Sequence, residues 1–465
     1  MRLRLAVQDL VAATGGRLAV PPGAFVPDVI TGVTTDSRQA APGDLFVALR
    51  GPHTDGHRFV ADAARRGAAL ALVSDPSAAA GPALVVPDTL RALGAVAALY
   101  RRSLTLTVIG ITGSVGKTTA VGLCAEVLAA RYRVGRSAES WNAELGVALT
   151  LLGLQASDEV AVIEMAMRGA GQIRELVEMA RPRIGAVTVI GDSHLELLGS
   201  RERIAAAKAE LLEGLPPDGV AVVNADDPLT ARLVRDVRCA VVRFGLGPQA
   251  DVRASGITPA EGATGFTLHM GGASHEVCLP LAGAHQVRNA LVAAAVAGVM
   301  GVAGPQIAAG LARARPATMR QEVTIVGEVL LVDDSYNASP QSMTAAFEVV
   351  RQVGGQRRRV LALGEMRELG PQSREFHRRV GQEAAGLSPA FLLAVGPHAD
   401  WYLEGASAAG LAWEAMAHVG TVHEAIPILC RFLRAGDVLL VKGSRAIAME
   451  HLVAALRARA PVGRS

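Results

Sequence analysis

The sequence predicts an α/β protein of three domains, and three features of the chain lead to this prediction. Its 465 residues are enough for roughly three domains of about 150 residues each. Short apolar runs alternate with segments of helical periodicity, which is the pattern of parallel sheets that helices cover on both faces. Half of the residues are hydrophobic, so apolar side chains suffice to fill a core in each domain.

The first predicted domain, residues 1–103, mixes short strands and helices. Apolar patterning predicts its strands at 30–35, 45–49, 68–73 and 83–86. Helical periodicity predicts helices at 59–66 and 90–102, with Asp88 as the N-cap of the second. This content predicts a small mixed α/β domain.

The second predicted domain, residues 104–316, carries the strongest strand signals. Apolar runs with helical patterns between them lie at 104–111, 160–163, 186–190 and 220–223. The most apolar later stretch, 290–304, is shorter than the roughly 20 residues that span a bilayer, and Pro305 follows it. We therefore expect a parallel sheet with one deeply buried helix, and no insertion into a membrane.

The third predicted domain, residues 317–465, repeats the strand–helix alternation on a smaller scale. Its strands are predicted at 329–332, 360–363, 391–395 and 438–441. Ser339 followed by Pro340 suits the N-cap and the first position of a helix. Residues 313–316 are the predicted link to the second domain.

Charge and cysteine usage exclude several classes of function. The formal net charge is +3 with no long basic run, which argues against a nucleic-acid-binding protein. The four cysteines lie far apart without a CxxC pair, so neither a metal site nor a disulfide framework is predicted. Residues 1–16 contain no apolar stretch of signal-peptide length. These features predict a cytoplasmic protein.

Lysine is scarce in this chain. It occurs at only three positions, Lys117, Lys208 and Lys442, against 43 arginines. Because arginine serves wherever a surface cation suffices, a retained lysine indicates a place that needs a compact ammonium or a reactive amine. Lys117 and Lys208 fall inside motifs described below, and Lys442 follows the predicted strand at 438–441 in the VKGSR motif at 441–445.

A glycine-rich segment gives the strongest local signal. It follows an apolar strand, opens a helix and consists of Gly113, Ser114, Val115, Gly116, Lys117, Thr118 and Thr119. Backbone N–H groups of such a loop approach phosphate oxygens, and the helix N-terminus favours negative charge. Lys117 would hold the terminal phosphates and Thr118 would ligate Mg²⁺. The pattern is a shortened GxxGKTT, because Ile111 stands where the full motif has glycine.

Three further polar residues follow predicted strands or lie on a predicted helix. Glu164 ends the run at 160–163, and His194 follows the run at 186–190. The carboxyl ends of strands in α/β sheets border the ligand crevice, and Mg²⁺ prefers hard oxygen ligands beside phosphate. Lys208 lies on a helix that Ser200 can cap. Its rarity, rather than its position, marks it as a candidate.

Together these motifs resemble the Mur ligase family, and the resemblance extends over nearly the whole chain. The glycine loop, Glu164, His194 and Lys208 lie in the family's order and at its spacings. In that family the matching lysine is carbamylated by CO₂ and becomes an oxygen ligand of a second Mg²⁺. The resemblance therefore implies two Mg²⁺ ions held by Thr118, Glu164, His194 and carbamylated Lys208. It also implies that Lys117, Glu164, His194 and Lys208 are catalytic.

The nucleotide contacts implied by the resemblance come from two domains. The segment at 283–290 resembles the family's GxHNxxNA motif, whose last Asn matches Asn289, while Gln286 replaces the first Asn. Arg320 matches an arginine that reaches the phosphates from the start of the third domain. The DDSYNASP segment at 333–340 resembles a motif that places Tyr336 and Asn337 near adenine and Asp334 near the ribose. The implied cofactor is ATP.

The first domain resembles the family's UDP-sugar-binding domain. The similar segments are at 35–38, 42–49 and 55–57, and within them Ser37 and Arg38 are the implied pyrophosphate contacts. Asn142 is an implied substrate contact, although Ala143 replaces the second Asn of the family's pair. The implied architecture is a UDP-binding domain, a central P-loop-type ATPase domain and a Rossmann-like C-terminal domain.

Within the family, three segments favour one substrate pair. DDSYN, the MAMRGAG segment at 165–171 and the LGEMRELG segment at 363–370 are closest to members that add D-alanyl-D-alanine to UDP-N-acetylmuramoyl-tripeptide. This resemblance implies an ADP-forming amide ligase that acts through an acyl phosphate, as a monomer.

The alternatives are a diaminopimelate- or lysine-adding relative, a folylpolyglutamate synthetase, and a regulatory P-loop NTPase. The folate enzyme lacks a domain like residues 30–60, no DNPR segment is present, and no NKxD motif supports a GTPase switch.

Overall fold

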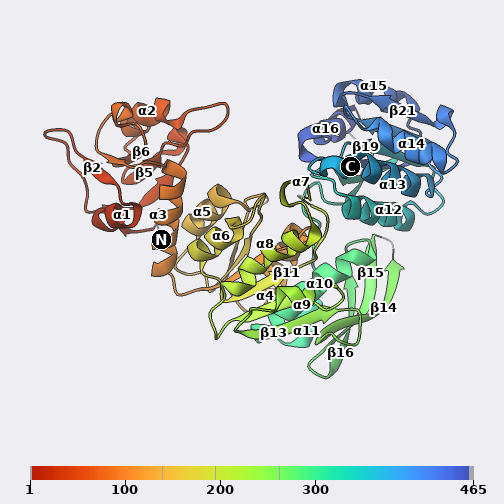
Figure 1. Ribbon diagram of the computed structural model, residues 1–465, viewed down its shortest axis with the longest axis horizontal. Helices are drawn as coiled ribbons and strands as arrows, with labels where there is room; N and C mark the ends of the chain where they lie inside the picture. Colours follow the sequence, from red (N-terminus) through yellow and green to blue (C-terminus); the bar gives the residue numbers. More distant parts are fainter. Residues whose placement is uncertain (1–2, 139, 194, 261, 460–465) are drawn as a thin grey trace.

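The computed structural model describes residues 3–138, 140–193, 195–260 and 262–459. Figure 1 shows three bodies, with the first and the third attached to different parts of the central one. Each body has its own sheet, so the predicted α/β class with three domains is confirmed. The boundaries at 103/104 and 316/317 stay predictions.

The first body is built on a five-stranded sheet with the order β2-β7-β6-β5-β4. Strands β4 to β7 are mutually parallel, and β2 is antiparallel to β7. The strands are β2 (Arg17–Ala19), β4 (Gly32–Thr34), β5 (Asp44–Val47), β6 (Leu70–Val73) and β7 (Ala83–Val85). The remaining elements are β1 (Leu5–Ala6), β3 (Val29–Ile30), α1 (Val7–Thr14) and α2 (Val60–Arg65). The predicted helix at 59–66 and all four predicted strand positions are confirmed.

Helix α3 (Thr89–Ser103) connects the first body to the central one. The Asp88 side chain accepts hydrogen bonds from the backbone N–H groups of the first turn, so the predicted N-cap is confirmed. The helix packs against α5 (Glu144–Gly153) and α6 (Gln172–Ala180) of the central body. Near its C-terminus, the Arg101 guanidinium donates to the carbonyls of Ala180, Leu104 and Leu106 at 2.9, 3.0 and 3.2 Å. This end of α3 is therefore fixed to the central body.

The central body contains a nine-stranded sheet with the order β16-β15-β14-β13-β12-β11-β8-β10-β9. Strands β8 to β14 are parallel, and only the β14–β15 and β15–β16 pairs are antiparallel. Its parallel strands are β8 (Thr107–Thr112), β9 (Val134–Arg136), β10 (Val160–Glu164), β11 (Ile184–Val187), β12 (Val220–Asn224), β13 (Ala240–Gly245) and β14 (Val252–Ala260). The last two strands are β15 (Ala263–Met270) and β16 (Ala273–Leu279).

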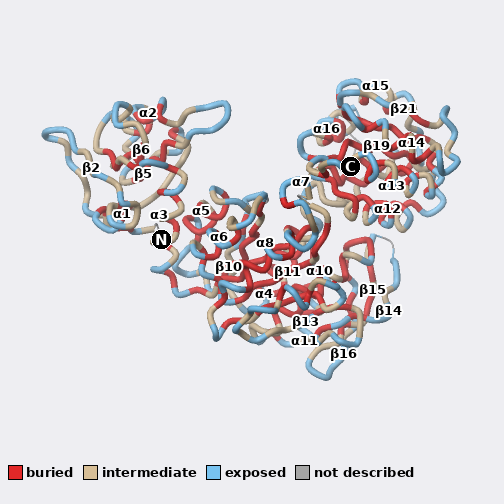
Figure 2. The backbone as a smooth tube through the Cα atoms, viewed as in Figure 1, coloured by how far each residue is buried: buried red, intermediate tan, exposed pale blue. Residues whose placement is uncertain are grey.

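Helices cover both faces of this sheet. One face packs on α4 (Lys117–Leu128), α10 (Ala284–Val299) and α11 (Gly304–Leu311). The other packs on α3, α5, α6 and α8 (Arg201–Glu213), and two short helices, α7 (Leu195–Leu198) and α9 (Thr230–Leu233), lie beside α8. Figure 2 shows the central strands and helices as the most deeply buried part of this body. Helix α10 is buried as predicted, and no helix in the described ranges is long and apolar enough for a bilayer.

The third body has a six-stranded sheet with the order β17-β18-β22-β19-β20-β21. All neighbours are parallel except β17 and β18. The strands are β17 (Glu322–Val326), β18 (Val329–Asp334), β19 (Arg359–Gly364), β20 (Phe391–Val395), β21 (Met416–Val419) and β22 (Val438–Lys442). Helices α12 (Pro340–Gly354), α13 (Ser373–Ala385) and α14 (Asp400–Ala408) cover one face, and α15 (Val422–Phe432) and α16 (Glu450–Arg459) cover the other. Ser339 caps α12, as predicted.

Replacement of Arg101 by alanine tests the attachment of α3. Three partly buried carbonyls would lose their donor, so we expect the free energy of unfolding to fall by about 1–3 kcal/mol in urea titrations. The neighbouring Arg102 is exposed and serves as a matched control, for which Arg102→Ala should change stability by less than about 0.5 kcal/mol. Equal midpoints for the two variants would contradict this assignment.

Candidate active site

A cavity of about 730 Å³ lies between the central and the third body, at the carboxyl ends of β8, β10, β18 and β22. Parallel α/β sheets bind ligands at this end of their strands. From the central body the lining includes Ser114, Val115, Gly116, Lys117, Thr118, Thr119, Asn142, Glu164 and Asn289. From the third body and its connecting segment it includes Arg320, Asp334, Tyr336, Asn337, Lys442 and Arg445. Most of the predicted site residues therefore meet at one place.

The glycine loop has a backbone that only glycine fits at two positions. Gly113 and Gly116 have φ angles of 149° and 86°. A Cβ atom on Gly113 would collide with the Thr188 hydroxyl, and one on Gly116 would collide with the Asn289 amide. The loop is fixed further by Ser114, whose hydroxyl accepts from the Gly191 N–H at 2.8 Å. Its open N–H groups at the start of α4 suit a phosphate.

Lys117 is the first residue of α4, and its side chain folds back over the loop. The ammonium donates to the Gly113 carbonyl at 2.9 Å. Burial lowers the pKa of Lys117, the nearby Glu164 carboxylate opposes this shift, and Arg320 adds to it. Lys117 and Arg320 are thus cations of the same small region, although they come from different bodies.

Glu164 ends β10 and is 2% exposed. One carboxylate oxygen accepts from the Thr118 hydroxyl at 2.7 Å, and the other accepts from the Asn142 amide at 2.8 Å. The structure thus brings together two of the four predicted metal ligands. A hydroxyl and a carboxylate next to a phosphate-type loop are the hard oxygen ligands that suit Mg²⁺. The Asn142 contact with Glu164, rather than with substrate, is a contact that the sequence did not predict.

Lys208 is 2% exposed on α8, whose N-cap is Ser200 as predicted. Within the described ranges its ammonium has neither a hydrogen-bond nor an ion-pair partner. Burial lowers the pKa of Lys208 well below its usual value, and the positive charge of Lys117 lowers it further. Leu211, one turn later, packs against Gly110 of β8, so this face of α8 points to the sheet. Lys208 is not one of the lining residues of the cavity.

The fourth predicted metal ligand, His194, lies outside the described residues. Ser193 beside it lines the cavity, and its hydroxyl donates to the Ser114 carbonyl at 3.3 Å. In the part of the chain that the structure describes, no three His, Cys, Asp or Glu side chains gather around one point.

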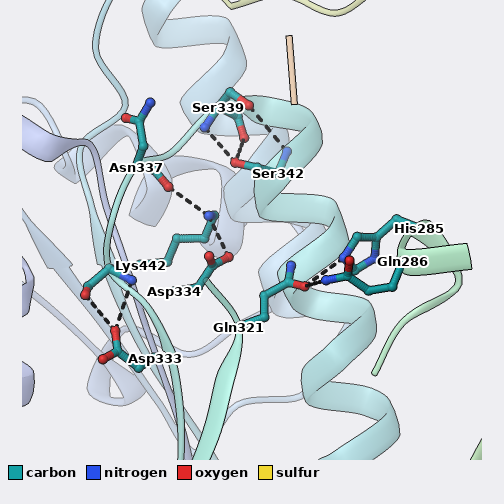
Figure 3. Close-up of polar contacts among 10 residues, drawn as sticks. His285, Gln286, Gln321, Asp333, Asp334, Asn337, Ser339, Ser342 and Lys442 are labelled. Atoms are coloured by element: carbon teal, nitrogen blue, oxygen red, sulfur yellow. Dashed lines mark hydrogen bonds and ion pairs between the residues drawn. The ribbon is translucent and has the colours of Figure 1, made fainter. Parts of the chain in front are cut away.

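On the third body, Lys442 and Asp334 form a buried ion pair, which Figure 3 shows. The Lys442 ammonium lies 2.7 Å from the Asp334 carboxylate and donates to the Asn337 carbonyl at 2.9 Å. Burial raises the pKa of Asp334 and lowers that of Lys442, and the attraction between the two groups opposes both shifts. The pair fixes the loop that follows β18. This contact gives the third rare lysine a structural role that its motif did not reveal.

Two guanidinium groups lie against the Tyr336 ring. The Arg320 and Arg445 carbons are 4.1 and 5.7 Å from the ring centre. Such contacts stabilise a cation through the negative face of the ring. Arg445 was not among the predicted site residues, although it belongs to the Val441–Arg445 motif that follows β22. Its place in the cavity depends on tertiary contacts and carries no local signal.

Ser37 and Arg38 lie in the first body and do not line this cavity. Ser37 begins a short 3₁₀ helix, η1 (Ser37–Gln39), and is buried. The exposed Arg38 guanidinium pairs with Asp36 at 2.8 Å, which lowers the pKa of Asp36 to about 2. The structure therefore separates the two residues predicted to contact pyrophosphate from the predicted nucleotide site.

Three family models match consecutive parts of the chain. They are the "Mur ligase family, catalytic domain" at residues 29–101, the "Mur ligase middle domain" at 111–297, and the "Mur ligase, glutamate ligase domain" at 319–445. Together they cover most of the sequence, in the order of the three bodies.

Curated relatives match over nearly their full lengths. Proteins named "UDP-N-acetylmuramoyl-tripeptide--D-alanyl-D-alanine ligase" are 36% identical in Synechocystis sp., covering 93% of both chains, and 33% identical in Bacillus subtilis, covering 97% of this chain and 98% of the relative. The Escherichia coli protein of the same name is 37% identical and covers 91% and 93%.

Solved structures agree with this result. MurF from Acinetobacter baumannii is 33% identical and superposes with a TM-score of 0.89 over 99% of this chain and 100% of the other. MurF from Thermotoga maritima, solved in complex with ADP, is 26% identical and has a TM-score of 0.80 over 92% and 97%. On the combined match of motifs, fold and full-length relatives, the chain belongs to the Mur ligase family.

Proposed function

We propose that this protein joins D-alanyl-D-alanine to UDP-N-acetylmuramoyl-tripeptide and forms ADP and phosphate, a step of peptidoglycan synthesis. The relatives that match over more than 90% of the chain carry this activity in their names. The observation that carries the proposal is the cavity in which the glycine loop, Thr118 and Glu164 face Arg320 and the Asp334 loop. ATP is the proposed phosphate donor, since the T. maritima neighbour binds ADP. Because ATP is available in the cytoplasm, we propose that the protein acts there. We also propose that it acts as a monomer.

The proposed reaction has two steps. First, an oxygen of the tripeptide's terminal carboxylate attacks the γ-phosphorus of ATP, the bond from this phosphorus to ADP breaks, and an acyl phosphate forms. Second, the amine nitrogen of D-alanyl-D-alanine attacks the acyl carbon, loses a proton, and phosphate leaves with the carbon–oxygen bond electrons. Activation is needed because a carboxylate is a poor electrophile. The protein supplies position and charge compensation rather than covalent chemistry.

Each named residue has a task in this scheme. The loop N–H groups and Lys117 hold the phosphates, and Arg320 approaches from the third body to offset charge on the transferred group. Asn289, Asp334, Tyr336 and Asn337 hold the nucleoside. In the first body, Ser37 and Arg38 would bind the UDP pyrophosphate, with Arg38 exchanging Asp36 for phosphate oxygens.

Two Mg²⁺ ions fit the donor set around Glu164. Thr118 and Glu164 would hold the first ion, and Glu164, His194 and carbamylated Lys208 the second. Bound there, the ions would neutralise phosphate charge. The uncharged Lys208 amine can attack CO₂ to form an N–C bond and release a proton. The resulting carbamate is an anionic oxygen ligand, whereas a protonated lysine would carry a positive charge. The lowered pKa of Lys208 favours the neutral amine that this reaction needs.

Phosphate release tests the proposed activity directly. We expect release from ATP and Mg²⁺ only when UDP-N-acetylmuramoyl-tripeptide and D-alanyl-D-alanine are both present, with one pentapeptide product per phosphate. A panel of lysine, diaminopimelate and glutamate as amines should give rates lower by at least about 100-fold, since buried polar groups would be left unpaired. Steady release without the peptide substrates would instead indicate an NTPase switch.

The substitution Lys208→Arg tests the carbamate. We expect the ligase rate to fall by more than about 100-fold, because a guanidinium remains charged and cannot take up CO₂. With ¹³C-bicarbonate, NMR should show a carbamate signal in the wild type that the variant lacks. Arg203→Lys, a conservative change at an exposed position of the same helix, serves as the control and should keep its rate. A folded Lys208→Arg variant with near-normal turnover would rule out the carbamate.

A further inference from the structure

The segment that carries Arg320 has an unusual backbone. Met319 and Gln321, on either side of Arg320, both have a φ angle of 57°, in the left-handed region that non-glycine residues rarely adopt. Such residues persist only where surrounding contacts hold them. One contact is the Met319 carbonyl, which accepts from the Tyr336 N–H at 3.3 Å. The direction of Arg320 into the cavity therefore depends on what holds its two neighbours.

Gln321 is held by the start of helix α10. Its side-chain oxygen accepts two hydrogen bonds, from His285 Nε2 at 2.7 Å and from Gln286 Nε2 at 2.9 Å, as Figure 3 shows. Burial lowers the pKa of His285 to about 4, with Lys442 and Arg288 nearby acting in the same direction. The imidazole is therefore neutral near pH 7, and its single N–H points to Gln321. Both donors come from the central body.

Gln286 passes this constraint to the glycine loop. Its side-chain oxygen accepts from the Asn289 amide at 3.0 Å. The Asn289 oxygen in turn lies directly against the α-carbon of Gly116, where a Cβ atom would not fit. Gln321 presents its side-chain oxygen to this contact, so Gln286 turns its NH₂ group to Gln321 and its own oxygen to Asn289. The orientation of three carboxamides is thereby fixed from the connecting segment to the loop.

The length of Gln286 matters for this arrangement. An Asn side chain at position 286 would be shorter by one CH₂, about 1.5 Å. The shorter side chain would not reach both Asn289 and Gln321, whose bonds to Gln286 are 3.0 and 2.9 Å long. The length of the Gln286 side chain therefore fits the distance between these two partners.

We propose that Gln286 and Gln321 act as one pair of positioning residues for the nucleotide. The pair holds Arg320 toward the phosphates from one side and Asn289 against the glycine loop from the other. Both ends of the pair lead to residues proposed to contact the nucleotide, Arg320 and Asn289, so we expect its effect to fall on ATP. This inference rests on the proposed function only in that the cavity binds a nucleoside triphosphate.

Substrate-resolved kinetics test the pair. Gln321→Met keeps the size of the side chain but removes the oxygen that accepts two hydrogen bonds. Gln286→Asn shortens the side chain, so that it can no longer contact both Gln321 and Asn289. For each variant we expect the KM for ATP to rise roughly ten-fold, with the KM for either peptide substrate within about two-fold of the wild type. The double variant should have a KM for ATP no higher than that of the more impaired single variant, because both substitutions disrupt the same contact.

Controls separate positioning from loss of structure. Gln356→Met, at an exposed turn after α12, should leave every constant unchanged. MgATP titrations by calorimetry measure nucleotide binding without the ligase reaction. Wild-type ATP affinity in both Gln321→Met and Gln286→Asn would overturn the proposal, as would an equal rise in all three KM values. Wild-type protein that binds MgATP without forming pentapeptide would count against the ligase function alone, and the variants would still decide on the pair.

Discussion

The site depends on one buried carboxylate. Glu164 leaves β10 beside the end of β8, because the two strands pair in parallel with Glu164 opposite Ile111. A buried negative charge is costly unless its oxygens are bonded, and here the Thr118 hydroxyl and the Asn142 amide each occupy one oxygen. A single side chain thus fixes the start of α4, the segment before α5 and the end of β10 relative to one another.

The third body places a charged pair, Asp334 and Lys442, at the same cavity. Its Asp334–Lys442 pair also stands at the ends of parallel strands, so the two sheets face each other with their ligand-binding edges. Polar contacts join the bodies there, and Ala282 and Leu195 of the central body also pack against the apolar core of the third body. Gln341 both donates to the Asp192 carboxylate at 2.8 Å and accepts from the Asp192 N–H at 3.2 Å.

The sequence predicted the central strands because they are buried on both faces and therefore read as apolar runs. It missed β9 and the strands β13 to β16, of which β15 alternates between buried and partly exposed positions. It predicted the β11 strand at 186–190, whereas β11 spans Ile184–Val187 and ends there because Thr188 and Val189 contact the glycine loop. The glycine loop and Glu164 could be found, since strand-end position and loop chemistry are local features. The pairing of Gln286 with Gln321 could not, because it joins residues 35 apart across two bodies and neither one stands out alone.

The three lysines show how one residue type serves three electrostatic settings. All are pulled toward the neutral form by burial, and they differ in what opposes that pull. Lys442 has an anionic partner in Asp334 and acts as a structural cation. Lys117 feels Glu164 at longer range and is the cation available to a phosphate. Burial lowers the pKa of Lys208 well below its usual value, and the positive charge of Lys117 adds to this shift instead of opposing it. An arginine could fill none of these places in the same way, because its guanidinium is larger and does not lose its proton. The retention of lysine at just these positions, in a chain that otherwise uses arginine, is therefore a consequence of burial at a charged site.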